Sequence, residues 1–201
     1  MRKRVLVGGT MRQMNTDAVE MIPVRLIISL AIISAIAVML VFASSSLRIF
    51  LAEHQVEQEC RLLQSTLSTM VGSGVPRDVD EASFAEGTKR VQTFTLPDSL
   101  LYLSFGGNPD SLNTGVLKPG LIEDGAAIFY QVEGGSKQVI WLPKETYKFR
   151  EGTYVDNKWI INGTGQSFII HSGGQITLVF ERVQKNRMIY ILIHGIDESN
   201  V

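Results

Sequence analysis

The sequence predicts an α+β protein in which a long N-terminal helix, first transmembrane and then amphipathic, precedes an antiparallel β domain, either a meander or a sandwich. Three observations support this fold class. Residues 26–43 carry no charge, residues 44–71 contain neither glycine nor proline, and from residue 91 onward short apolar runs alternate with turn residues. The first two patterns are typical of one continuous helix, and the third is typical of strands joined by tight turns.

The predicted membrane anchor is the uncharged segment 26–43. A helix of that length spans about 27 Å, close to the roughly 30 Å hydrocarbon core of a bilayer. A core helix of a soluble domain would show a polar face, and a cleaved signal would have a shorter apolar region of about 7–15 residues. We therefore expect a single-pass anchor over residues 21–45. The side chains expected to contact lipid are Leu26, Ile27, Ile28, Leu30, Ile32, Ile33, Ile36, Val38, Leu40 and Phe42.

Basic residues flank the predicted span unequally. A short leader, residues 1–20, and the entry of the span contain Arg2, Lys3, Arg4, Arg12 and Arg25. Within about twenty residues on the other side, the window in which this bias is counted, there are only Arg48 and Arg61. Because cytoplasmic flanks carry the excess of lysine and arginine, we expect the N-terminus in the cytoplasm and the C-terminal domain outside the cell membrane.

Residues 46–72 are predicted to extend the membrane helix as an amphipathic segment. Glu57 and Arg61 form a favourable i,i+4 pair on its polar side, and Gly72 and Pro76 should end the helix. The apolar residues recur at spacings of three and four, in one stripe that we expect to pack on the β domain: Ile49, Ala52, Val56, Cys60, Leu63, Leu67 and Met70. Cys60 is expected to be a small buried hydrophobe, with an intermolecular disulfide as the alternative.

Residues 73–90 are expected to form a linker, and residues 91–201 the exported β domain. Glycine, asparagine and proline separate most of its apolar runs, as in hairpins. The runs predicted as strands are 91–96, 100–105, 126–132, 138–142, 159–162, 167–171, 175–183 and 187–194. The last run is apolar on both faces, so we expect a central strand that the helix covers.

No set of residues predicts catalysis, a cofactor or a metal site, and we expect neither enzyme activity nor a small-molecule substrate. His171 and His194 lack nearby carboxylates at ligand spacing. The segment 108–115, NPDSLNTG, has the oxygen-rich composition of a calcium loop, but the oxygens are misspaced and an ordinary polar turn is expected. Asn162 begins a sequon for N-glycosylation.

The charge balance and the cysteine content exclude one class of partner and one kind of stabilisation. With 19 basic and 20 acidic residues, the chain lacks the basic surplus of a nucleic-acid-binding protein. Its single cysteine excludes an intramolecular disulfide framework. The partners that remain are the lipid bilayer and other proteins.

The order of these features resembles type IV pilin-like proteins: a short basic leader, an acidic residue at the mouth of an apolar helix, an amphipathic continuation and a C-terminal β domain. The entry sequence DAVEMIPVR, residues 17–25, is most similar to small pilin-like or secretion-linked membrane proteins of archaea. The resemblance covers roughly the first 70 residues. It implies that Glu20 meets the free amino terminus of a neighbouring subunit. From the residues alone, Asp17 and Glu20 have the spacing of a capping box that starts the helix.

Three functions remain open from the sequence. The first is a pilin-like structural subunit of a surface filament or secretion apparatus, with like subunits or apparatus proteins as partners. The second is a monomeric signal-anchored module whose β domain binds a ligand or polymer outside the cell. The third is an exported enzyme, which the lack of a recognisable acid, base or nucleophile set disfavours.

Overall fold

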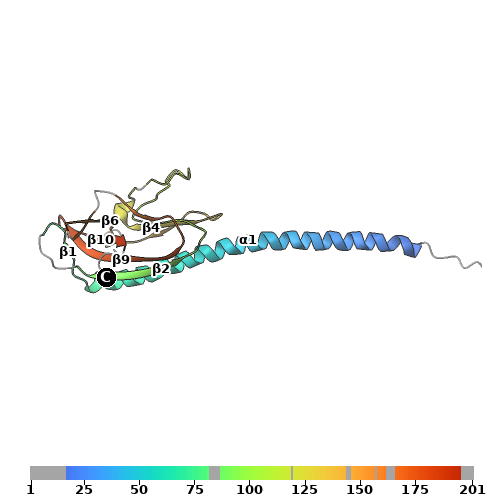
Figure 1. Cartoon of the computed structure of the whole chain (residues 1–201), viewed down its shortest axis with the longest axis horizontal. Helices are drawn as coiled ribbons and strands as arrows, with labels where there is room; N and C mark the ends of the chain where they lie inside the picture. The colour runs from blue at the N-terminus through green and yellow to red at the C-terminus, as the bar shows by residue number, and fades with distance from the viewer. Residues whose placement is uncertain are drawn as a thin grey trace, which may run out of the picture. The chain divides into compact units, whose positions relative to one another are not determined.

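The computed structural model of the chain describes residues 17–81, 87–118, 120–143, 146–156, 158–161 and 166–195, without the side chains of residues 17–22 and 123. Contacts between residues group into two compact units, Met1–Ser46 and Leu47–Val201. Helix α1, Asp17–Ser73, begins in the first unit and ends in the second, and all described strands belong to the second (Figure 1). The expected α+β class, a long N-terminal helix followed by a β domain, is confirmed.

Within the first unit, α1 is helical from Asp17 and continues through Pro23. Proline has no amide proton, so this position removes one hydrogen bond from the ladder. Serine hydroxyls in the apolar segment donate to carbonyl groups of the same helix. Ser34 Oγ donates to the Leu30 carbonyl at 2.8 Å, and Ser44 Oγ donates to the Val41 carbonyl at 2.8 Å. These hydrogen bonds lower the free-energy cost of placing a serine hydroxyl in an apolar environment.

The larger sheet is organised around its longest strand, β9. Strand β10 pairs with one edge of β9, while β2 and the short β1 pair with successive parts of the other edge. On its far side β10 pairs with β6, which pairs with β7. The strands are β1 Arg77–Asp78, β2 Lys89–Leu96, β6 Phe149–Val155, β7 Lys158–Ile161, β9 Gly174–Lys185 and β10 Met188–Gly195. Strand β10 is therefore central, as its apolar sequence predicts.

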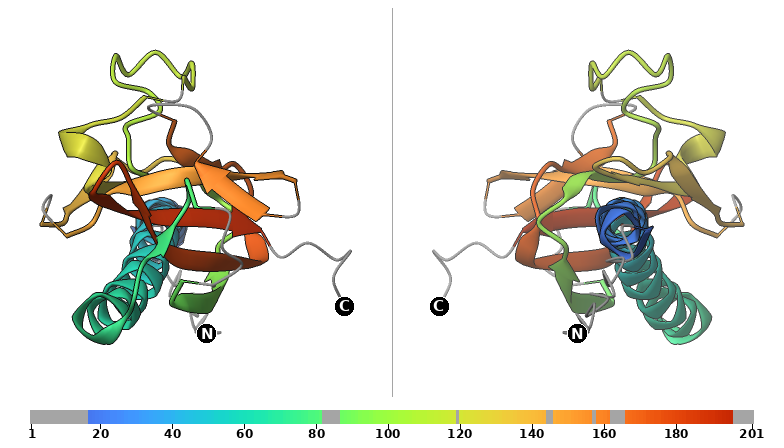
Figure 2. Two further views of the ribbon diagram at one scale, coloured as in Figure 1. Left: turned by 90° about the vertical axis from the view of Figure 1, so that its left-hand side faces the viewer. Right: turned by 90° about the vertical axis from the view of Figure 1, so that its right-hand side faces the viewer.

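The smaller sheet has four antiparallel strands in the order β5, β4, β3, β8. Their bounds are β3 Leu100–Phe105, β4 Ala127–Val132, β5 Gln138–Trp141 and β8 Phe168–Ile170. A short 3-10 turn, η1 Glu123–Gly125, precedes β4. Leu117 and Ile122 pack on Tyr102 and Phe129, on the face of this sheet that points away from the main core. Leu117 and Ile122 belong to the connection between β3 and β4, and Figure 2 shows this connection projecting from the side of the β domain opposite α1.

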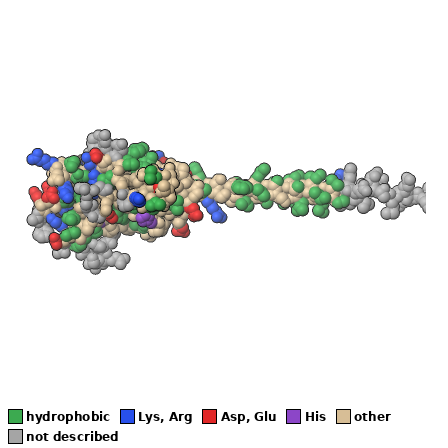
Figure 3. All heavy atoms as spheres, turned by 90° about the horizontal axis from the view of Figure 1, so that it is seen from above, with side chains coloured by type: hydrophobic (Ala, Val, Ile, Leu, Met, Phe, Trp, Pro, Cys, Tyr) green, Lys and Arg blue, Asp and Glu red, His purple; other side chains and the backbone are tan. Residues whose placement is uncertain are grey.

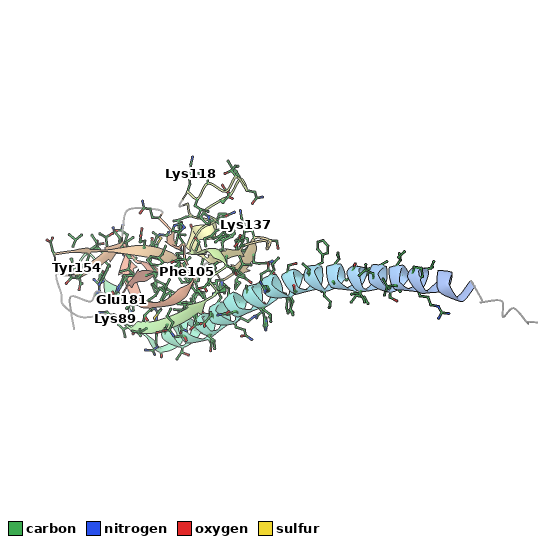
Figure 4. All side chains as sticks on the ribbon, turned by 45° about the vertical axis from the view of Figure 1, so that its right-hand side comes forward. Lys89, Phe105, Lys118, Lys137, Tyr154 and Glu181 are labelled. Carbon is green, nitrogen blue, oxygen red and sulfur yellow. The ribbon has the colours of Figure 1, made fainter. Side chains whose placement is uncertain are left out.

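The main core lies between the two sheets and the part of α1 that belongs to the second unit. Its centre is aromatic, and Phe105, labelled in Figure 4, contacts three other rings. The ring centroids of Phe94, Phe149 and Phe180 lie 6.0, 5.7 and 5.9 Å from that of Phe105. Tilted and edge-on contacts of this kind add to the stabilisation from apolar burial.

Each of the eight predicted runs overlaps a strand, but the structure adds two strands and two parallel pairings. Strand β6 has the sequence FREGTYV, which lacks a clear apolar alternation, and it pairs with β10 in parallel. Gly152 of this strand sits where a Cβ would come within 3.2 Å of Ile193 O and of the Trp159 ring. The apolar alternation of a local sequence does not reveal such a strand, because its residues are determined by close contacts with distant parts of the chain.

The segment predicted as a linker contains β1, which pairs with β9 in parallel. Arg77 of β1 forms a buried bidentate ion pair with Glu181 of β9, at 2.8 Å from Nε and 3.0 Å from Nη2. The same Nη2 also donates to the Trp159 carbonyl at 2.7 Å. Both charges are therefore satisfied, which a buried ion pair requires.

Candidate functional site

The first functional feature is the apolar part of α1. Among the described residues it is the one helix long and apolar enough to cross a membrane, with a mean hydropathy of 2.9 over an 18-residue window. All ten residues expected to contact lipid are between 52% and 70% exposed in the single chain. Figure 3 shows hydrophobic side chains along this helix. Such a continuous apolar surface is unfavourable in water, so it is consistent with a transmembrane or signal-anchor segment.

The structure places the predicted apolar stripe of α1 in the core of the second unit. Val56, Cys60, Leu63, Leu67 and Met70 are fully buried there. Ala52 is also buried, and Ile49 is partly buried and packs against the same core. Residues 47–73 are thus an integral part of the β domain.

Cys60 belongs to this buried set. Burial, with smaller contributions from the charges of Glu59 and Glu57, raises the pKa of its thiol to about 12. A thiol that is both buried and protonated is unreactive. Cys60 is therefore a packing residue in the folded domain, and the alternative of an intermolecular disulfide has no exposed sulfur to support it.

The opposite side of the same helix segment is uncharged and faces solvent. We call this set of six exposed residues the outward face: Leu47, Leu51, Gln58, Leu62, Ser65 and Thr69. Their spacings of four, seven, four, three and four residues place them along one side of the helix. Charged residues lie on its flanks, with Glu57 and Arg61 on one side and Arg48 and Glu59 on the other. Leu47, Leu51 and Leu62 on this face are therefore exposed in the single chain, although they do not pack on the core of their own domain.

A groove of about 370 Å³ lies between α1 and the hairpin formed by β4 and β5. Its α1 wall consists of Phe50, Glu53, His54, Glu57 and Arg61. Its β wall consists of Tyr130, Gln138, Val139 and Ile140. The ring planes of Phe50 and His54 are stacked, 6° apart, with centroids at 6.1 Å. Arg61 Nη2 donates to Glu57 Oε1 at 2.6 Å, so this carboxylate is paired.

The Tyr130 side chain in this groove is close to the carboxylates of Glu57 and Glu53. Burial raises the pKa of Tyr130 to about 12, and the charges of Glu57 and Glu53 raise it in the same direction. Glu53 forms no ion pair within the described part of the chain. The groove therefore offers one uncompensated carboxylate next to apolar side chains.

The loop with a calcium-like composition is organised by an internal cation. The backbone amides of Thr114 and Gly115 donate to the two carboxylate oxygens of Asp110, at 2.8 and 2.9 Å. The ammonium of Lys137 donates to the carbonyl oxygen of Asp110 and, at 2.7 Å, to Asn113 Oδ1. Figure 4 shows Lys137 and Lys118 on the loop-bearing side of the domain. The structure is a polar turn fixed by Lys137.

The pKa of Asp110 follows from these contacts. Desolvation alone raises it, but hydrogen bonds from the amides of Gly115 and Thr114 and the charge of Lys137 outweigh that effect. The net result is a lowered pKa, so the carboxylate stays ionised and acts as a fixed acceptor for the loop backbone. This role is structural.

Two predicted sites fall outside the described parts. Glu20 lies in α1, but its side chain is not among those described, and Asn162 lies outside the described residues. His171 and His194 are not brought into a metal site. His194 stacks on the Trp159 ring at 3.8 Å, and within the described ranges no three His, Cys, Asp or Glu residues are grouped to hold a metal ion.

Comparison with protein families, with curated proteins and with solved structures finds no match to this chain. The site assignments therefore rest on the chemistry of the residues themselves. The groove is the feature that sequence reasoning missed. Its two walls come from segments about seventy residues apart in the sequence, and no local pattern marks their meeting.

Proposed function

We propose that this chain is a single-pass membrane protein with an exported β domain, and that it serves as a pilin-like structural subunit of a surface filament or secretion apparatus. The orientation rests on the four basic residues of the leader, Arg2, Lys3, Arg4 and Arg12. An excess of lysine and arginine marks the cytoplasmic flank of a membrane span. The proposal gives the chain no catalytic role.

The observation that carries the assembly role is the outward face of α1. A surface helix that buries one side on its own domain ordinarily presents charged residues on the other. Here the outward face keeps Leu47, Leu51 and Leu62 exposed, at 56%, 55% and 58%. Packing against the same helix of another copy would bury these leucines, and the small Ser65 and Thr69 allow two backbones to approach closely.

Cysteine crosslinking in native membranes tests this assembly. Leu62→Cys places a thiol on the outward face, and Val91→Cys places one on β2 at a matched exposure, 58% against 59%. The buried Cys60 does not take part in mild oxidation. We expect Leu62→Cys to give covalent dimers while Val91→Cys stays monomeric. Equal crosslinking of the two variants, or none in either, would count against assembly through this face.

N-terminal sequencing of the mature protein tests the pilin-like aspect separately. A mature start near Val19 places an acidic residue, Glu20, next to a new amino terminus, as the resemblance implies. An intact Met1 instead supports a plain signal anchor. The measurement does not depend on the crosslinking result.

The second candidate is a monomeric signal-anchored binding module. The open groove between α1 and β5 favours it, because the Glu53 carboxylate there has no ion-pair partner within the described chain and lies beside the exposed Phe50 and Val139 side chains. Both candidates share the anchor and the exported domain. Persistent monomers of Leu62→Cys in the membrane would favour the binding module.

A further inference from the structure

Strand β5 has an edge to which no other described strand is paired. Among the described strands it pairs only with β4, in the register Ile128 with Ile140 and Phe129 with Val139. The amide of Leu142 donates to the Ala126 carbonyl at 2.9 Å, which makes this a hydrogen-bonded position. Since hydrogen-bonded and non-hydrogen-bonded pairs alternate along an antiparallel ladder, Ile140 is also bonded to β4. Val139, in between, therefore directs its N–H and C=O away from β4.

Trp141 lies two residues further along the strand, so its N–H and C=O also point away from β4. Neither Val139 nor Trp141 has a backbone partner on its outward side within the described part of the chain. Their side chains are 38% and 55% exposed. A row of unpaired backbone groups of this kind is a template for another strand.

The groove runs along this edge. Gln138, Val139 and Ile140 are consecutive, yet all three line the same hollow. Successive side chains of a strand point to opposite faces, so three neighbours share a hollow only when it borders the edge of the strand. The opposite wall is α1, which presents the exposed Phe50 ring and the carboxylate of Glu53.

The edge of β2, by contrast, is covered at Thr95. Gln55 Nε2 of α1 donates to the Thr95 carbonyl at 2.8 Å, and the Thr95 amide donates to Glu59 Oε1 at 3.2 Å. The helix thus occupies both outward backbone groups of Thr95, whereas those of Val139 and Trp141 have no partner within the described part of the chain. The edge of β5 is therefore available for pairing at these two residues.

We infer that the free edge of β5 binds an extended segment of another polypeptide that carries a lysine or arginine. The segment adds a fifth strand to the smaller sheet through the N–H and C=O groups of Val139 and Trp141. Charge complementarity specifies the side chain, because Glu57 is already paired with Arg61 whereas Glu53 has no ion-pair partner in the described chain. An apolar side chain of the segment would pack on Phe50. Main-chain bonds supply affinity in this mode, and side-chain pockets supply specificity.

Amide exchange on the full chain in detergent micelles tests this inference. The probe is the peptide acetyl-Thr-Val-Lys-Val-Thr-amide, and the matched control peptide has glutamate in place of lysine. With the lysine peptide we expect exchange at the Val139 and Trp141 amides to slow at least tenfold. The glutamate peptide should leave both amides unchanged. No slowing by the lysine peptide, or equal slowing by both peptides, would overturn the inference.

Variants of the full chain test separately the charge of Glu53 and the backbone groups of β5. Glu53→Gln should weaken binding of the lysine peptide at least fivefold, whereas Glu133→Gln, an exposed carboxylate outside the groove, should not. Val139→Pro should abolish binding with β5 still paired to β4, because proline is tolerated where the N–H faces outward. Protection of Val139 and Trp141 that rises with protein concentration without peptide would assign the edge to a second copy instead, and would overturn the inference.

Discussion

Glu59 Oε1 accepts a hydrogen bond from the backbone amide of Thr95 at 3.2 Å, and this contact joins α1 to the outer edge of β2. Gln55, one turn earlier, donates to the carbonyl of the same residue. An edge strand with free backbone groups invites pairing with other chains, and the helix removes that exposure at Thr95. Together with the buried stripe, these bonds make residues 47–73 a structural element of the β domain.

The C-terminal end of α1 is held in a second way. The last turn of the helix contains no basic residue. Arg182 of β9 instead brings its Nη1 within 2.9 Å of the Val71 carbonyl and also donates to the Gly74 carbonyl. A cation at this end satisfies free carbonyl groups and complements the helix dipole.

The first prediction concerns the buried stripe. Leu67→Asp should lower the free energy of unfolding of the β domain by roughly 4 kcal/mol, because it removes a buried side chain and inserts an unpaired charge. Glu57→Gln, on the polar side, should change it by less than about 1 kcal/mol. Urea unfolding followed by the fluorescence of Trp141 and Trp159 measures both, since both tryptophans lie in the β domain. Equal, mild effects would mean that the helix is a free stalk or a subunit interface instead.

The helix was predictable because its signals are local. A stretch without charge, a stripe at spacings of three and four, and glycine followed by proline each report on neighbouring residues only. The eight predicted strands follow in the same way from short apolar runs between turn residues. The central place of β10 follows from apolar residues on both of its faces.

Strands β1 and β6 were not predictable, because distant residues decide them. Arg77 is a strand residue through its pairing with β9 and its ion pair with Glu181. The residues of β6 form a strand because they pair with β10, which lies about forty positions away in the sequence. The groove likewise exists only after α1 and β5 have met. Sequence pattern reports which faces are apolar, but not which strands become neighbours.

The second prediction concerns the membrane. The full chain should remain with membranes after carbonate extraction, whereas the fragment 46–201 should be soluble. Central Leu, Ile, Phe and Val residues each contribute about −0.3 to −0.6 kcal/mol to insertion, and a central arginine costs about 2.5 to 3.5 kcal/mol. Ile33→Arg should therefore reduce membrane retention, and Leu62→Arg, similarly exposed but in the second unit, should not. Release of the unmodified chain into the aqueous fraction would contradict the anchor.

The third prediction concerns alkaline pH. Burial is the main cause that raises the pKa of Cys60, Tyr102 and Tyr130 to about 12, from ordinary values of 9.0 for cysteine and 10.0 for tyrosine. Above about pH 9 the unfolded chain binds fewer protons than the folded chain, so stability falls as pH rises. The contribution of these groups is fully present below pH 9 and is lost towards pH 12. Each group contributes at most about 1.4 kcal/mol per pH unit.

Urea unfolding at about pH 8 and about pH 10.5 measures this loss. Tyr130→Phe should make the pH dependence shallower because it removes one titrating group. Tyr154→Phe is the control, since the Tyr154 side chain is 42% exposed. A free energy of unfolding that stays constant over this interval would contradict the prediction.

The fourth prediction concerns the loop held by Lys137. Lys137→Met removes the ammonium that binds the Asp110 carbonyl and Asn113, so amide exchange at Thr114 and Gly115 should accelerate at least tenfold. Lys118→Met, exposed in the same loop, is the control and should have little effect. Calcium added to the unmodified chain should not slow exchange, because the oxygens already bind a cation. Protection by calcium would instead support a metal site in this loop.

The last prediction concerns Glu20, on which the pilin-like function depends. A carboxylate at the mouth of a membrane helix is costly when it faces lipid, so it requires a partner or water. A carboxylate near the start of a helix is favoured by the helix dipole, and the sequence spacing of Asp17 and Glu20 is that of a capping box. A pilin-like subunit would use it differently, as the ion-pair partner of an amino terminus in the adjacent copy.

Glu20→Gln separates these two roles. Glutamine still serves a capping box, so insertion, folding and accumulation of the variant should match those of the unmodified chain. Its charge is gone, however, so the Leu62→Cys crosslink between copies should be lost when Glu20→Gln is added in the same chain. The measurement is the yield of covalent dimer in membranes at equal protein level. An unchanged yield would remove the electrostatic role of Glu20, because outward-face contacts alone would then account for the crosslink.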